Sequence, residues 1–204
     1  MHLLDRNVRL ERFETFDVGA LGDGLPVVLE GLWDDPTNAR IRACGARLLD
    51  SPEAIPAGVG REGVRDTTVR GDSTRWIEPE NVDVALEPLL VMFHALGSHL
   101  SQAAYLGLRR FELQLAGYRE GAFYARHRDA FRGSGGRRVT AIYYPNDPWQ
   151  PGDGGELAVW TPQGEKRIEP VAGRLVVFLS ASLEHAVLPV VRPPRQAFTA
   201  WYRG

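Results

Sequence analysis

The chain has 204 residues, of which 44% are hydrophobic and 25% charged, and its formal net charge is −2. This composition argues against a disordered or fibrous protein, and the charge argues against a dedicated binder of nucleic acid or of anionic membranes. A chain of this length buries roughly 70% of its unfolded surface, so a single domain over residues 1–204 folds without disulfides or a structural metal.

The first half of the sequence predicts a short strand, two helices and a long loop. Residues 25–33 are expected to form the strand, and Asp-Asp-Pro at 34–36 then starts a helix that runs to about Asp50. Residues 51–67 are rich in proline, glycine and charge and predict a long loop, which is commonly functional. Residues 68–78 are expected to be extended. A second, longer helix follows, because apolar residues recur at 3.6 spacing: Leu86, Leu89, Leu90, Phe93, Leu96, Leu100 and Ala104.

After Gly107 the hydrophobic period changes from 3.6 to 2, which is typical of strands with one buried face. Many short strands without helices between them indicate a β-sandwich or barrel. The sequence therefore predicts a mainly β protein, with a helical support layer over residues 1–106 and a β-core over residues 107–204. Beyond a first strand around residues 111–116, strands are expected at 122–127, 138–144, 155–160, 174–179, 184–191 and 197–202.

Two of the five histidines, His127 and His185, lie in the β-half. His127 and Asp129 are two residues apart, so on a strand both side chains leave the same face. Two imidazoles and one carboxylate can occupy one face of an octahedral metal and leave about three positions open, which is typical of Fe(II) oxygenases. An H-x-D spacing also occurs by chance, so a surface His-Asp pair is the competing interpretation. The H-E-x-x-H motif of a helical zinc site is absent.

Arg195, ten residues after His185, adds a second kind of binding group. On a strand it shares one face with Ala197, Thr199 and Trp201. A buried guanidinium costs several kcal/mol unless an anion binds to it, and arginine binds carboxylates through a two-pronged fork. This order of ligands and arginine is what a 2-oxoglutarate-dependent oxygenase needs, because the metal chelates one end of the oxoacid and the arginine holds the other.

The stretch from Tyr118 to Trp201 resembles the catalytic core of the prolyl 4-hydroxylases of the hypoxia-sensing type. By element order the resemblance covers roughly residues 25–203. The matching motifs are Y-x-x-G…Y-x-R-H-x-D at 118–129, R-V-T-x-I-Y-Y at 138–144, G-G-x-L at 154–157, H-x-V-x-P at 185–189, R-x-x-x-T-x-W-Y at 195–202 and, upstream, RGDSTRWIE at 70–78.

The resemblance implies a double-stranded β-helix, or jelly roll, packed against the helical layer. It further implies that His127, Asp129 and His185 ligate Fe(II), with 2-oxoglutarate and O2 as cosubstrates and ascorbate as a reductant that such enzymes can use. Arg195 would pair with the distal carboxylate of 2-oxoglutarate, and Tyr144 would donate its hydroxyl to the same carboxylate. The remaining cosubstrate pocket would be formed by Tyr118, Ile142, Leu157, Val187, Thr199 and Trp201.

The reaction that the resemblance implies is hydroxylation at C4 of a prolyl residue in a protein, coupled to conversion of 2-oxoglutarate to succinate. We expect the 51–67 loop, together with Arg70 and Asp72, to contact this polypeptide, on the basis of position only. Bacterial relatives point to elongation factor Tu as the substrate, again by resemblance. An oxygenase acting on a small molecule would share all these residues, and a non-catalytic jelly-roll binding module is the third alternative.

We expect a cytoplasmic protein that binds neither membrane nor nucleic acid. The N-terminus lacks the apolar run of a signal peptide, Cys44 is the sole cysteine, and no segment approaches the roughly 18 apolar residues of a membrane span. A nucleic-acid demethylase of the same superfamily would show further Asn and Arg residues after His185.

Six arginines between residues 119 and 138 predict a positive rim around the proposed metal ligands.

Overall fold

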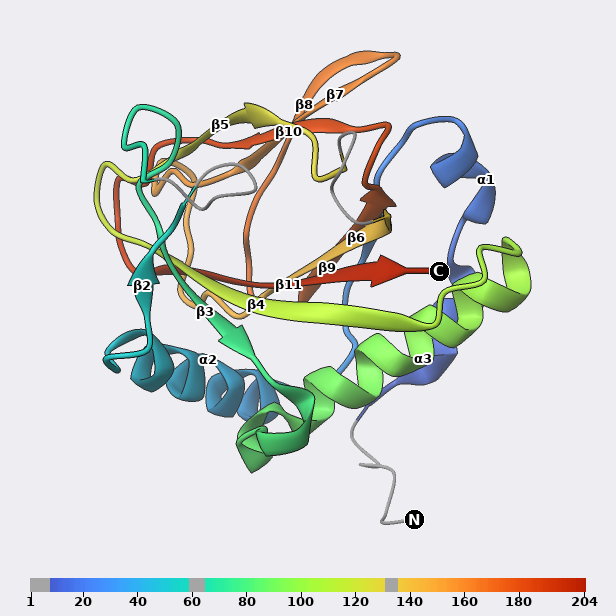
Figure 1. Cartoon of the computed structure of the whole chain (residues 1–204), viewed down its shortest axis with the longest axis horizontal. Helices are drawn as coiled ribbons and strands as arrows, with labels where there is room; N and C mark the ends of the chain where they lie inside the picture. Colours follow the sequence, from blue (N-terminus) through green and yellow to red (C-terminus); the bar gives the residue numbers. More distant parts are fainter. Residues whose placement is uncertain (1–7, 59–64, 131–135) are drawn as a thin grey trace.

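The computed structural model describes residues 8–58, 65–130 and 136–204. Its strands form two antiparallel sheets, of seven and four strands (Figure 1). The strands are β1 (Val27–Leu29), β2 (Ile55–Pro56), β3 (Ser73–Ile77), β4 (Arg110–Tyr118), β5 (Tyr124–His127), β6 (Arg137–Tyr144), β7 (Leu157–Thr161), β8 (Gly164–Ile168), β9 (Arg174–Leu179), β10 (Glu184–Val187) and β11 (Arg195–Arg203). Their order is β1-β9-β6-β11-β4-β3-β2 in the larger sheet and β5-β10-β7-β8 in the smaller.

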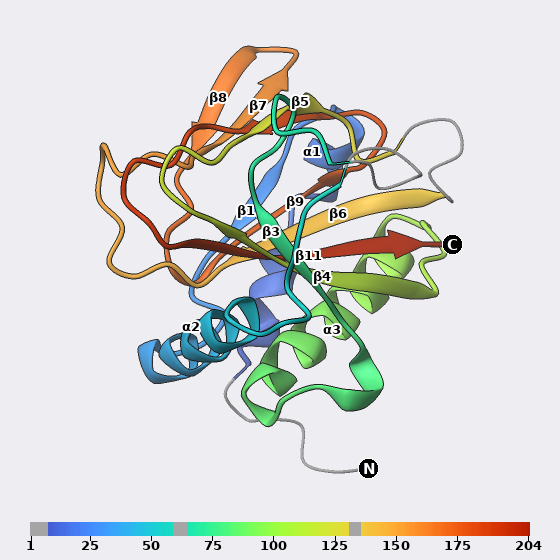
Figure 2. The ribbon, with the colours of Figure 1, turned by 60° about the vertical axis from the view of Figure 1, so that its left-hand side comes forward.

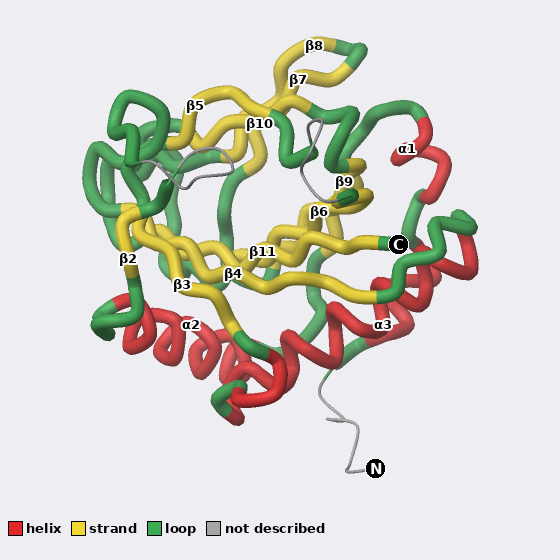
Figure 3. The backbone as a smooth tube through the Cα atoms, viewed as in Figure 1, coloured by secondary structure: helices red, strands yellow, loops and turns green. Residues whose placement is uncertain are grey.

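Helices cover one face of the larger sheet, and the smaller sheet lies over the other face (Figures 1 and 3). This is the jelly-roll arrangement packed against a helical layer that the resemblance implied. The helical segments are η1 (Leu10–Thr15), α1 (Val18–Gly22), α2 (Asp35–Leu49), η2 (Pro79–Asn81), η3 (Val84–Leu86) and α3 (Glu87–Ala103), of which α2 and α3 are the long ones.

The two long helices begin where the sequence signals placed them. The Asp34 carboxylate accepts a hydrogen bond from the Thr37 amide at 2.9 Å, a cap worth about 1 kcal/mol at the start of α2. Helix α3 buries its apolar side against the larger sheet, where the Tyr202 hydroxyl donates to the Phe93 carbonyl at 2.7 Å. By length and composition alone the segment Val84–Ala103 could cross a membrane, but polar residues interrupt its apolar run and its apolar side is part of the protein core.

Three apolar clusters hold the layers together. The largest lies between the helices and the seven-stranded sheet and includes Leu96, Leu115 and Phe198. A second lies between the two sheets and includes Leu157 and Phe178. A third joins β4 of the larger sheet to β10 of the smaller. A cavity remains between the two sheets.

Strands from the first half of the chain complete the larger sheet, so the boundary near residue 106 separates the long helices from most strands but does not divide the sheet. β1 pairs with β9, and β3 pairs with β4. Strand β8 was not predicted; it pairs with β7 in a hairpin that projects from the molecule (Figure 2). Most of β8 is exposed, so it lacks the alternation of apolar residues that marks a half-buried strand. The short η1 and α1 were also not predicted.

Candidate metal and cosubstrate site

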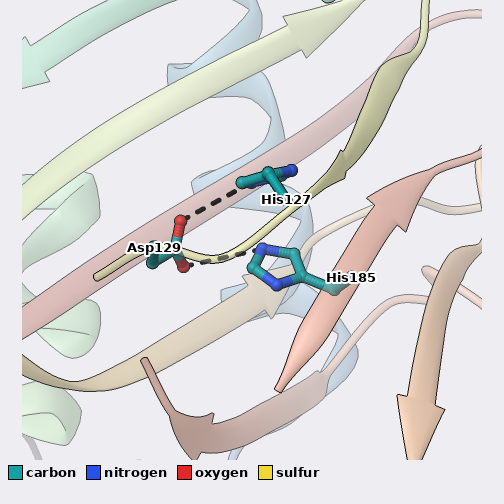
Figure 4. Close-up of side chains that lie close together, drawn as sticks. All are labelled: His127, Asp129 and His185. Atoms are coloured by element: carbon teal, nitrogen blue, oxygen red, sulfur yellow. Dashed lines mark ion pairs between the residues drawn. The ribbon is translucent and has the colours of Figure 1, made fainter. Parts of the chain in front are cut away.

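The fold brings His127, Asp129 and His185 together, with potential ligand atoms all within 4.8 Å of one another (Figure 4). His127 ends β5 and lies directly opposite His185 in the ladder between β5 and β10. The Asp129 carboxylate lies between them, with 3.6 Å from Oδ1 to His127 Nε2 and 3.6 Å from Oδ2 to His185 Nε2. The two oxygen atoms therefore face one imidazole each.

Both imidazoles are oriented through their Nδ1 atoms. Nδ1 of His127 lies 2.7 Å from the Ala125 carbonyl, and Nδ1 of His185 lies 3.3 Å from the Leu183 carbonyl. A carbonyl only accepts, so Nδ1 carries the proton and Nε2 keeps its lone pair for a metal. Burial lowers the pKa of His185 to about 4, although the Asp129 carboxylate acts in the opposite direction. His185 is therefore neutral near pH 7, as a ligand must be.

Asp129 is a buried carboxylate with a hydroxyl partner. Burial raises its pKa, but His185, His127 and the Trp201 indole together lower the pKa by more, so the net shift is well below the ordinary value. Thr140 Oγ1 donates to Asp129 Oδ2 at 2.8 Å, and the Ser180 hydroxyl lies 2.8 Å from Thr140 Oγ1. Two imidazoles with Nε2 directed toward the carboxylate, together with that ionised carboxylate, form a donor set that fits Fe(II).

The three residues face a cavity of about 450 Å³ between the two sheets. On β11, Arg195, Ala197, Thr199 and Trp201 line it together, so the face that strand parity assigned to these residues is the cavity face. Other predicted residues also line it: Arg70, Tyr118, Ile142, Leu157 and Val187.

Arg195 is a buried cation without a carboxylate partner in the described parts of the chain, and only 3% of the residue is exposed. Its Nε donates to the Gly155 carbonyl at 3.0 Å, and its guanidinium carbon lies 4.5 Å from the ring centroid of Tyr118. Gly155 permits this approach because a Cβ there would lie 3.2 Å from Arg195 Cγ and the backbone has φ +74°. The guanidinium still requires an anion.

Tyr144 provides a second unfilled hydrogen-bonding group beside Arg195. Its hydroxyl is buried and has no hydrogen-bond partner within the described residues. Burial raises its pKa, while the charge of Arg195 lowers it. The Arg195 guanidinium carbon lies 5.1 Å from the Tyr144 ring centroid. A cation and a neutral hydroxyl donor side by side fit the distal carboxylate of 2-oxoglutarate.

Two predicted residues do not line the cavity. Tyr144 is absent from the cavity lining although its ring lies beside the Arg195 guanidinium, and Asp72 has a fully buried side chain that binds Arg70 through two hydrogen bonds of 2.8 and 2.6 Å. Of the predicted 51–67 loop, Ile55, Pro56 and Gly58 line the cavity, and residues 59–64 lie outside the described residues.

Several cavity residues were missed by sequence reasoning. Gln114 and Ala116 lie on the polar side of the alternation in β4, a signal that could have identified them. Trp76 and Ile55 are 48% and 59% exposed and give the cavity an apolar rim. The others are Thr74 and Tyr124.

The positive rim is partly neutralised by carboxylates that are distant in sequence. Arg126 forms an ion pair with Glu184 on β10, and Arg128 lies 3.6 Å from the same carboxylate. Arg137 pairs with Glu112 on β4 at 3.2 Å. A count of charges along residues 119–138 therefore overstates the charge at the cavity mouth.

Comparisons with known proteins agree with this geometry. Residues 113–203 match the 2OG-Fe(II) oxygenase superfamily. The chain is 35% identical over 170 residues to the human prolyl hydroxylase EGLN3, an alignment that covers 78% of this chain and 67% of that protein. Among the curated relatives, which include a PKHD-type hydroxylase of Maricaulis maris, the chain spans between 39% and 67% of their length.

Solved structures are similar over nearly the whole chain. The crystal structure of a Pseudomonas putida prolyl-4-hydroxylase has a TM-score of 0.81 and 36% identity, and the match covers 91% of this chain and 96% of that one. A Trichoplax adhaerens prolyl hydroxylase, solved with a peptide fragment of hypoxia inducible factor, has a TM-score of 0.82 over 96% of this chain and 90% of that one. Its 24% identity makes it evidence for the fold alone.

Proposed function

This chain belongs to the 2OG-Fe(II) oxygenase superfamily, and we propose that within it the protein is a prolyl 4-hydroxylase acting on a cytoplasmic protein. The similarity to the Pseudomonas putida prolyl-4-hydroxylase, at 36% identity over 96% of that chain, carries the proposal. The site independently supports the oxygenase chemistry of the proposal, because the donor set fits Fe(II) and the buried Arg195 requires an anion. Fe(II), with 2-oxoglutarate and O2, supplies the oxidative decarboxylation that yields succinate and CO2 and hydroxylates the substrate.

The residues of the chain have separate tasks in this proposal. His127, Asp129 and His185 hold the metal through Nε2, carboxylate and Nε2 atoms that are already oriented. Arg195 and Tyr144 bind the distal carboxylate, which directs the keto end of 2-oxoglutarate toward those ligands. Apolar side chains between the sheets exclude water, so the polar contacts act in a medium of low dielectric constant.

The exposed rim is suited to a polypeptide rather than to a free amino acid. Ile55 and Trp76 line the cavity and are largely exposed, so they present apolar surface to solvent at its rim. A prolyl residue in an extended segment can place its ring inside while its neighbours cover this rim. Elongation factor Tu, the candidate from the resemblance, is the first protein to test.

The proposal is tested by incubating host proteins with the enzyme, Fe(II) and 2-oxoglutarate and searching by mass spectrometry for prolines that gain one oxygen atom. We expect succinate formation and a modified proline together, and we expect both to be lost in His127→Ala. Free proline and other small molecules form the second arm. Succinate coupled to oxidation of a small molecule, with no proline modified in any protein, would refute the proposed substrate class. Cell fractionation tests the cytoplasmic location.

A further inference from the structure

An irregularity in β5 places Tyr124 on the same face as the metal ligand His127. His127 lies opposite His185 on β10, whereas Tyr124 lies opposite Val187. The two residues that separate His127 from Tyr124 on β5 therefore face the single residue that separates their partners on β10. Residues three apart on a regular strand point to opposite faces, and one extra residue reverses that relation. As a result the two rings stack, with centroids 3.7 Å apart and an interplanar angle of 16°.

The Tyr124 ring is also in contact with a clamped cation. The guanidinium carbon of Arg70 lies 4.0 Å from the Tyr124 centroid. Asp72 holds that guanidinium through the 2.8 and 2.6 Å hydrogen bonds, and its own side chain is fully buried. A continuous set of contacts therefore runs from Asp72 through Arg70 and Tyr124 to His127.

Backbone pairing ties this set of contacts to β5. The Ala125 amide donates to the Val69 carbonyl at 2.8 Å, and the Gly71 amide donates to the Phe123 carbonyl at 3.0 Å. Arg70 and Tyr124 form an isolated antiparallel bridge between them. Residues 69–71 thus act as a short neighbour of β5, and the residues on both sides of Arg70 are hydrogen-bonded to that segment of the chain.

His127 is the ligand that most needs such support. Its side chain is 18% exposed, compared with 8% for Asp129 and 5% for His185. Deeply buried His185 is held by its surroundings, including the Phe178 ring at 4.8 Å between centroids. The His127 ring lies nearer solvent, and its close parallel contact is with Tyr124. A ligand keeps its geometry only where neighbouring groups restrict its rotation.

We propose that Tyr124 is a positioning residue that orients His127 for metal binding, and that the Arg70–Asp72 pair holds Tyr124 in place. The inference rests on the proposed function, which supplies the metal that the site would hold. It also gives Arg70 and Asp72 a task different from the direct substrate contact expected from their sequence position. Asp72 is enclosed and does not line the cavity, so it acts through Arg70.

The test is a calorimetric titration of the purified full chain with Co(II) alone, without 2-oxoglutarate or substrate. Tyr124→Leu removes the flat ring, and we expect roughly ten- to hundredfold weaker Co(II) binding with a changed visible absorption spectrum of the bound ion. Tyr124→Phe keeps the ring, so its Co(II) affinity and the absorption spectrum of the bound ion should match those of the wild type. Arg126→Met is the matched control, because Arg126 lies on the same strand and stacks over Trp160 at 4.2 Å instead.

A double variant tests the same contacts at other positions, so the result does not depend on whether Tyr124→Leu folds. Arg70→Met combined with Asp72→Asn removes the clamp without leaving a buried unpaired charge, and it should weaken Co(II) binding in the same direction as Tyr124→Leu. Wild-type Co(II) affinity and spectrum in both variants would overturn the proposal, and a raised KM for peptide alone would then assign Tyr124 to substrate. If Co(II) affinities follow the expected order while no protein proline is hydroxylated, this inference is supported and the proposed substrate is refuted.

Discussion

Removal of Arg195 should stabilise the protein on its own while weakening its binding of 2-oxoglutarate. Arg195 is 3% exposed as a residue, and its guanidinium lacks a carboxylate partner among the described residues. An unpaired buried charge costs several kcal/mol, and one hydrogen bond to a carbonyl offsets about 1.5–3 kcal/mol of that cost. Methionine fills a similar volume without charge, so Arg195→Met should raise the free energy of unfolding by roughly 1–2 kcal/mol.

The same substitution removes the fork that holds the distal carboxylate. Loss of one partner of a buried charge pair costs about 2–5 kcal/mol, or roughly 30- to 5,000-fold in the Kd of 2-oxoglutarate. At a concentration one hundred times the wild-type Kd, 2-oxoglutarate stabilises the wild type by about 2.7 kcal/mol. Under the same conditions it should stabilise Arg195→Met by less than about 1 kcal/mol.

Urea denaturation followed by tryptophan fluorescence measures both effects, with and without 2-oxoglutarate and with Co(II) present throughout. Arg174→Met is the matched control, since Arg174 is a largely buried arginine on β9 that is paired with Glu30 at 2.6 Å. The control should lose stability and keep its response to 2-oxoglutarate. If Arg195→Met loses stability as the control does, or if 2-oxoglutarate stabilises it as much as the wild type, the reasoning is refuted.

Three further substitutions test other parts of the site. Thr140→Val removes the hydroxyl that donates to Asp129, and Co(II) titration should show roughly tenfold or greater weakening; unchanged affinity would contradict this role. Gly154→Ala places a Cβ against the Pro189 carbonyl oxygen at φ +72°, so denaturation should show a loss of roughly 1–3 kcal/mol, more than in Gly152→Ala, where the Cβ meets nothing within 4 Å. Trp76→Ala should raise the KM for a peptide severalfold without changing the KM for 2-oxoglutarate, and equal increases would argue against a substrate contact.

Local sequence patterns determined most of the secondary structure and one face of the site. The Asp-Asp-Pro signal located the start of α2, and 3.6 spacing located α3. The period of 2 identified most strands and assigned Arg195, Ala197, Thr199 and Trp201 to one face. These features depend on residues a few positions apart, so the backbone period alone is enough to relate them.

Other features depended on which segments become neighbours. The stack of Tyr124 on His127 exists because β5 has an extra residue relative to β10, and strand parity alone would place the two rings on opposite faces. Glu112 and Glu184 reduce the charge of the arginine-rich segment from strands far along the chain. Register, bulges and ion pairs between distant strands arise from pairing and packing in three dimensions. A local pattern carries no record of the partner strand, which is why only the tertiary structure decided them.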